Sequence, residues 1–182
     1  MAIALGAGWL AFPRALYRTE SQPVDFSHKT HIEKAGAKCE DCHAFREDGS
    51  FAGAPTLEKC GSCHAAAMGT SAAEKNFIDQ YVTPGREPRW EPYARQPENV
   101  SFLHSVHVKR AKLGCEGCHG DTGQSDTLRP RQVDRISGYS RDIWKLQTTI
   151  AGRPATHGMK MTDCVACHRE RGMENSCLDC HK

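Results

Sequence analysis

The chain has 182 residues, of which 38% are hydrophobic and 7% are aromatic. This length suggests one domain or two small ones, and the aromatic content is thin for a conventional hydrophobic core. The formal net charge of +2 at pH 7 is too small to indicate a nucleic-acid-binding protein.

The first predicted element in chain order is an apolar stretch from Met1 to Pro13. It is too short to span a bilayer, which needs about 20 residues, and it lacks the basic start of a signal peptide. Trp9, Arg14 and Tyr17 are residue types that gather at membrane interfaces. We interpret residues 1–20 as an interfacial segment or the outer end of an anchor helix that begins before this chain. A partial signal segment and a helix docked on a partner are the alternatives.

The motif Cys-x-x-Cys-His occurs five times and uses all ten cysteines. The copies are Cys39, Cys42 and His43; Cys60, Cys63 and His64; Cys115, Cys118 and His119; Cys164, Cys167 and His168; and Cys177, Cys180 and His181. This motif is the attachment site of a c-type haem, in which the cysteines form thioether bonds and the histidine is the proximal iron ligand. A zinc ribbon needs Cys pairs in twos, and a disulfide framework does not explain the histidines. The sequence therefore predicts five covalently bound haem c groups.

Five porphyrins would supply the apolar interior that the composition lacks. We therefore expect a mostly irregular fold with short α-helices, wrapped around a haem stack, with no sizeable β-sheet. The haem propionates would make the holoprotein more acidic than its sequence, and Arg and Lys side chains would pair with some of them. Because covalent haem attachment takes place outside the cytoplasm, the chain is expected to be exported.

An internal repeat is visible: residues 26–43 align without gaps on residues 102–119, with eight identical positions. One haem-binding unit is therefore used twice, as repeat A at about residues 24–64 and repeat B at about residues 100–182. Each copy carries two histidines three residues apart. Such residues share a face of a helix, so each imidazole could reach a different iron.

Capping residues predict where the helices begin and end. Ser27 and Ser101 are suitable N-caps for the two repeat helices, and Gly36 and Gly114 are suitable ends. A further helix is expected at about residues 69–82.

Five histidines remain outside the haem motifs: His28, His31, His104, His107 and His157. Their number matches the distal ligands that five six-coordinate irons need. Iron with two histidines is low-spin and has no open position, so it transfers electrons without binding substrate. Met159 and Met161 are alternative ligands to His157.

Proximity in the sequence suggests how the distal histidines are shared. We assign His28 to the haem of Cys39 and Cys42, His104 to that of Cys115 and Cys118, and His157 to that of Cys164 and Cys167. His31 and His107 would cross to the haems of Cys60 and Cys63 and of Cys177 and Cys180, in either order.

The element Phe-x-His-x-x-His ahead of a haem motif occurs at Phe26–His31 and at Phe102–His107. With it the chain resembles the class III multihaem cytochrome c family. That resemblance implies that the first His of the element ligates the haem that follows, and that the second crosses to another haem. An N-terminal anchor with five or six such haems also resembles the multihaem subunit of bacterial quinone oxidoreductase complexes, namely the menaquinone reductase complex and alternative complex III. The former implies a sixth haem, for which this sequence offers no site.

The resemblance implies an electron-transfer subunit rather than an enzyme. Residues 21–182 would form its pentahaem cytochrome domain, on the periplasmic side of the bacterial inner membrane. It would relay electrons between a soluble periplasmic cytochrome c and the iron–sulfur and integral-membrane subunits of the complex. The alternatives are a free periplasmic shuttle to a terminal reductase and a multihaem reductase with an open haem.

Overall fold

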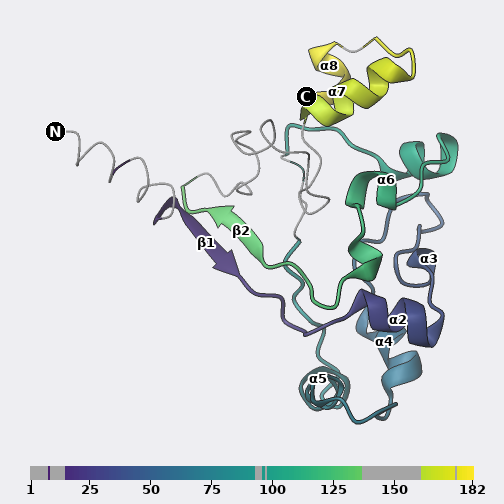
Figure 1. Cartoon of the computed structure of the whole chain (residues 1–182), viewed down its shortest axis with the longest axis vertical. Coiled ribbons are helices and arrows are strands. Elements are labelled where there is room, and N and C mark those ends of the chain that lie inside the picture. Colours follow the sequence, from purple (N-terminus) through teal and green to yellow (C-terminus); the bar gives the residue numbers. More distant parts are fainter. Residues whose placement is uncertain (1–7, 9–14, 93–95, 97, 137–160, 175) are drawn as a thin grey trace. The chain divides into compact units, whose positions relative to one another are not determined.

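The computed structural model describes residues 8, 15–92, 96, 98–136, 161–174 and 176–182 (Figure 1). The elements in chain order are β1 (Tyr17–Glu20), α2 (His28–Ala35), α3 (Cys39–Cys42), α4 (Leu57–His64), α5 (Ala72–Phe77), η1 (Ile78–Val82), η2 (Ser105–Arg110), α6 (Glu116–His119), η3 (Thr122–Gln124), β2 (Arg131–Asp134), α7 (Met161–Glu170) and α8 (Cys177–Cys180). Of these, η1 and η2 are π-helices and η3 is a 3-10 helix.

The helices are short and the β-structure is slight. The α-helix α7 has 10 residues, and the two strands have four residues each. Irregular segments connect these elements (Figure 1). The predicted fold class is confirmed.

The apolar core is as thin as the composition predicted. Among the described residues, Phe77 and Val133 are the buried hydrophobic side chains, with exposed fractions of 8% and 3%. Large apolar side chains such as Leu178 and Leu103 are instead 83% and 61% exposed. Contacts between protein side chains therefore supply little of the apolar burial that usually stabilises a chain of this length.

The described residues form two compact units. The first takes its residues from Met1–Ser21, Glu91–Val100 and Arg129–Lys182, and the second from Gln22–Trp90 and Ser101–Leu128.

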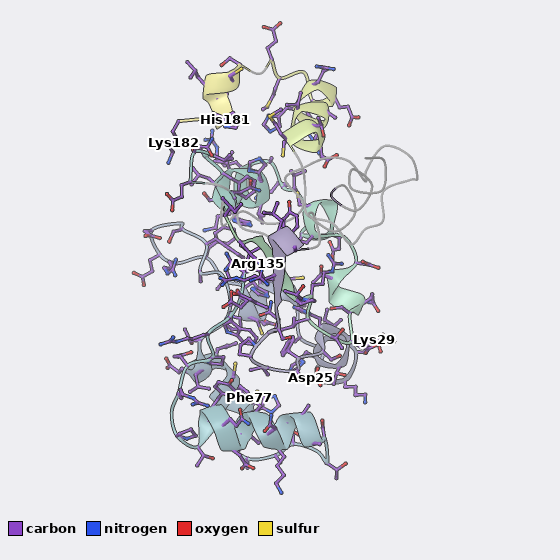
Figure 2. All side chains as sticks on the ribbon, turned by 90° about the vertical axis from the view of Figure 1, so that its left-hand side faces the viewer. Asp25, Lys29, Phe77, Arg135, His181 and Lys182 are labelled. Carbon is purple, nitrogen blue, oxygen red and sulfur yellow. The ribbon has the colours of Figure 1, made fainter. Side chains whose placement is uncertain are left out.

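In the first unit, β1 pairs antiparallel with β2, with Tyr17 opposite Asp134. Figure 1 shows the two arrows side by side. The C-terminus is held by a bridge between Val100 and His181 and by a 3.0 Å hydrogen bond from the Lys182 N–H to the Asn99 carbonyl. Figure 2 labels His181 and Lys182 next to each other at this end of the chain.

No helix of the described residues is both long and apolar enough to cross a membrane. Residues 1–7 and 9–14, which carry most of the predicted anchor segment, lie outside the part of the chain that the structure describes.

In the second unit, α5 continues directly into η1. The predicted helix at residues 69–82 is therefore confirmed, with its start at Ala72. The Tyr81 hydroxyl donates a 3.0 Å hydrogen bond to the Pro23 carbonyl, which ties this helix to the segment that enters α2.

Helix α2 has the predicted ends. The Ser27 hydroxyl accepts a 3.0 Å hydrogen bond from the Thr30 N–H, as an N-cap residue does. Gly36 ends the helix with a φ of 68°, in the left-handed region that glycine adopts without steric cost.

The predicted ends of the second repeat helix are wrong. Helix η2 begins after His104 rather than after Ser101. The residue that ends it in the left-handed conformation is Lys112, with a φ of 54°, rather than Gly114. The Leu113 N–H bonds to a carbonyl within the helix, so the helix is already closed before Gly114 is reached. Lys112 occupies the place that Gly36 has in the first copy.

Candidate haem-binding sites

All five Cys-x-x-Cys-His motifs lie on a single helical turn. At three of them the histidine N–H donates to the carbonyl of the first cysteine, over 2.8 Å for His43 and 2.9 Å for His119 and His181. The other two motifs lie within α4 and α7. Residues three and four apart share a helix face, so both thiols and the imidazole of each motif are on one side of the helix. None of the ten cysteines, all of which are described, forms a disulfide.

The first repeat places its aromatic side chains in a defined cluster. The Phe26 ring stacks on His31, with centroids 4.3 Å apart, and meets His28 edge-on at 5.0 Å. The Ala37 N–H closes the helix by donating to the His31 carbonyl over 3.1 Å. The two imidazoles are thereby held in different orientations on one helix.

The second repeat has the same arrangement. The Phe102 ring stacks on His107 at 4.6 Å and meets His104 edge-on at 4.8 Å. The Leu113 N–H donates to the His107 carbonyl, again over 3.1 Å. The repeat found in the sequence is therefore also a structural repeat, although one copy is an α-helix and the other a π-helix.

Three pairs of imidazole rings have nearly the same separation. The centroid distances are 6.4 Å for His28 and His43, 6.0 Å for His31 and His64, and 6.3 Å for His104 and His119. In each pair one ring belongs to a Phe-x-His-x-x-His element and the other follows a Cys pair.

This separation fits a metal ion between the two rings. Imidazole nitrogen binds a first-row metal such as zinc at about 2.0–2.1 Å. A five-membered ring with bonds of about 1.33 Å has a radius of about 1.1 Å. Two such rings on opposite sides of one ion therefore have centroids about 6.3 Å apart, whereas stacked rings in direct contact can approach more closely, as Phe26 and His31 do at 4.3 Å.

Hydrogen bonds at Nδ1 orient several of these rings. Nδ1 of His31 lies 2.7 Å from the Ser27 carbonyl, and Nδ1 of His43 lies 2.8 Å from the Gly53 carbonyl. A carbonyl accepts only from a protonated nitrogen, so in a neutral ring Nε2 keeps the lone pair. Ligating histidines commonly have such a partner on the other ring nitrogen.

The electrostatics favour neutral imidazoles. Burial, followed by the nearby rings of His43 and His31, lowers the pKa of His28 below its usual range. Burial, followed by two neighbouring imidazoles, likewise lowers the pKa of His104. Neutral imidazole is the form that binds metal.

The attachment cysteines of three motifs are neighbours. Burial raises the pKa of the Cys39 thiol, and the Cys115 thiol beside it adds to the effect. Burial also raises the pKa of Cys60, with a further contribution from the Cys42 thiol. Burial raises the pKa of Cys42 as well, and Cys63 is among the neighbours that contribute. The first motif is thus the neighbour of both the second and the third.

The remaining predicted ligands are distributed over both units. His107 lies on η2 in the second unit, whereas His168 ends the haem motif of α7 and His181 follows α8, both in the first. His157 and Met159 lie outside the described residues. Met161, the alternative ligand that is described, begins α7 and is 65% exposed.

Sequence reasoning missed the partners of the proximal histidines. The Gly53 carbonyl faces His43, and the Glu74 carboxylate lies 2.7 Å from His64 Nδ1. In both cases the partner is ten residues after the histidine. A backbone carbonyl and a carboxylate share no pattern that a sequence would reveal.

The residues present fit haem c groups. Trp90 Nε1 is a buried donor without a protein partner among the described residues, and a haem propionate would be a suitable acceptor. When bound, the haem supplies an iron that accepts and returns one electron.

The single-turn motifs and the paired imidazoles define a multihaem c-type cytochrome. A family model described as the class III cytochrome C family matches residues 11–87. A relative, the "Menaquinone reductase, multiheme cytochrome c subunit" of Nitratidesulfovibrio vulgaris (strain Hildenborough), is 36% identical over 198 residues, which span 100% of this chain and 87% of the relative. The chain belongs to the class III cytochrome c family, and the resemblance to the menaquinone reductase subunit is confirmed. Family membership implies covalently bound haem c.

Proposed function

We propose that this chain is the electron-relay subunit of a membrane-bound quinone oxidoreductase complex, with five haem c groups whose irons each have two histidine ligands. The observation that carries the proposal is the common separation of 6.0–6.4 Å between paired imidazole rings. An iron with imidazole on both sides has no position for a substrate. The chain would therefore transfer electrons and catalyse no bond chemistry.

The ring pairs support one arrangement of distal ligands. In it, His28 serves the haem of Cys39 and Cys42, His31 that of Cys60 and Cys63, and His104 that of Cys115 and Cys118. His107 has the place in the second repeat that His31 has in the first, and His31 faces a histidine of another motif. We therefore assign His107 to the haem of Cys177 and Cys180, and His157 to that of Cys164 and Cys167.

The neighbouring thiols support an order of haems within the second unit. Cys39 lies beside Cys115, and Cys42 lies beside Cys60 and Cys63. Covalent attachment at these positions would bring the porphyrin edges of neighbouring motifs together. The haem of the first motif would be in the middle of this row, with those of the second and third motifs on either side.

The relative suggests the partners. Its name describes a subunit of menaquinone reductase. We infer that this chain belongs to a complex of that kind, and that its partners there are integral-membrane and iron–sulfur subunits. A soluble cytochrome c would exchange electrons with the relay on the periplasmic side of the inner membrane, because haem is attached outside the cytoplasm. Residues 1–20 would hold the pentahaem domain, residues 21–182, at the membrane.

Ligation can be tested on the purified holoprotein, whose intact mass should show five haems. His31→Ala should convert one iron in five from low spin to high spin in absorption and electron paramagnetic resonance spectra. Glu33→Ala, an exposed change on the same helix, should leave all five low-spin. Five low-spin irons in His31→Ala would overturn the ligand assignment.

The partner proposal is tested by purifying the tagged chain from native membranes in mild detergent. Integral-membrane and iron–sulfur subunits should co-purify, together with quinone-linked electron transfer to a soluble cytochrome. Recovery of the chain as a monomer from the soluble fraction, with no such activity in the membranes, would contradict it and favour a free shuttle.

A further inference from the structure

Glu74 holds its carboxylate against His64 by a set of directed contacts. Its Oε1 lies 2.7 Å from His64 Nδ1 and accepts a 2.8 Å hydrogen bond from the Met68 N–H, while its Oε2 accepts a 3.1 Å bond from the Gly69 N–H. The Glu74 side chain is 12% exposed and that of His64 is 23% exposed. The carboxylate is thus fixed by the backbone in front of one ring nitrogen and shielded from solvent.

Other imidazoles of the second unit have neutral acceptors. His31, His43 and His107 each have Nδ1 within 2.7–2.9 Å of a backbone carbonyl. A carboxylate accepts a stronger hydrogen bond than a carbonyl, because it carries a full charge. His64 therefore differs from these three histidines in the charge of its partner rather than in the length of its hydrogen bond.

The surroundings of this pair are apolar on one side. Phe77, a buried hydrophobic residue, meets the His64 ring edge-on with centroids 6.2 Å apart. Figure 2 labels Phe77 on its helix. A charge in a place shielded from water acts more strongly on its neighbours than the same charge in solvent.

We propose that Glu74 is a positioning residue that gives the haem of Cys60 and Cys63 a lower reduction potential than the haem of Cys39 and Cys42, whose motif histidine, His43, donates to a carbonyl, an inference that rests on the proposed function. By drawing the Nδ1 proton towards itself, the carboxylate makes the imidazole a stronger electron donor to iron. A stronger donor stabilises the ferric state of the one-electron Fe(III)/Fe(II) couple. The haem at one end of the proposed row would therefore be reduced after the haem in the middle of that row.

The test is a redox titration of the five-haem holoprotein with Glu74→Gln, which keeps the shape of the side chain and removes its charge. One of the five one-electron transitions should move to higher potential by about a tenfold change in the reduction equilibrium, which is about 59 mV. The other four should stay in place. Glu74→Asp, which keeps the charge but shortens the side chain, should move the same transition by a smaller amount.

Glu58→Gln is the matched control, because Glu58 is an exposed carboxylate on the helix that carries Cys60 and His64. It removes one charge near the same motif without touching the imidazole, and it should leave all five transitions where they are. An equal shift in Glu58→Gln would show a general charge effect and overturn the inference, as would unmoved transitions in both Glu74 variants. The proposed function fails separately, if the parent protein itself lacks five low-spin irons.

Discussion

Exchanging the residues that end the two repeat helices should change stability in opposite directions. Gly36 and Lys112 occupy the same place in the two copies, with φ values of 68° and 54°. In each copy the next N–H donates over 3.1 Å to the carbonyl of the second histidine of the repeat. Gly36→Lys should therefore destabilise the protein, and Lys112→Gly should stabilise it.

The magnitude follows from the backbone alone. A residue with a side chain loses about 1–2 kcal/mol of stability in the left-handed region. A glycine instead lowers the free energy of unfolding by about 0.4–1 kcal/mol, because it gives the unfolded chain more conformational freedom. A Cβ added at Gly36 meets no atom within 4 Å, and Lys112 is exposed, so packing adds little in either case. We expect a change of about 1 kcal/mol in the free energy of unfolding for each variant, with opposite signs.

The assay is guanidinium unfolding of the holoprotein, followed by circular dichroism and by haem absorption. Gly61→Ala in α4 is the control, because its Cβ also meets nothing within 4 Å and its φ is not positive. Alanine there should stabilise the helix by about 0.5–1 kcal/mol. A shift of both repeat variants in the same direction would refute the reasoning.

The remaining predictions concern a helix cap and a charge. Ser27→Ala removes the hydroxyl that accepts from the Thr30 N–H and should destabilise the protein by about 1 kcal/mol in the same unfolding assay, with the haem count by mass unchanged. The Met68 N–H first, then His64 and the Gly69 N–H, lower the pKa of Glu74 against the opposing effect of burial. A lowered carboxyl pKa stabilises the fold above the unfolded-state value of about 4.3. The stability that Glu74 adds over Glu74→Gln should be complete at pH 7 and decline as the pH falls below about 4; a constant difference down to pH 2 would contradict this.

Features set by neighbouring residues could be predicted from the sequence. The Ser27 cap and the Gly36 end depend on chemistry within one helical turn, and the structure has both of them where the sequence indicated. The internal repeat predicted from the sequence is also present in the structure, since Phe26 and Phe102 each stack on the second histidine of their copy.

Features set by distant parts of the chain could not be predicted. Pairing of β1 with β2 joins segments more than a hundred residues apart. Neither strand has a residue periodicity from which this pairing could have been predicted. The position of Glu74 against His64 depends on how the segment after α4 turns back. In the second repeat the residue in the left-handed conformation is Lys112. The expectation that a glycine ends the helix therefore placed this end at Gly114, two residues too late.

Helix α2 presents two imidazoles that face histidines of different motifs, and this restricts how the gene can change. One residue inserted between His28 and His31 would turn the His31 ring by about 100° around the helix axis. The His31 ring would then no longer face His64. Deletions would do the same in the other sense. Among natural variants, length differences should therefore accumulate in the connecting segments, while the three-residue interval on this helix is inherited unaltered.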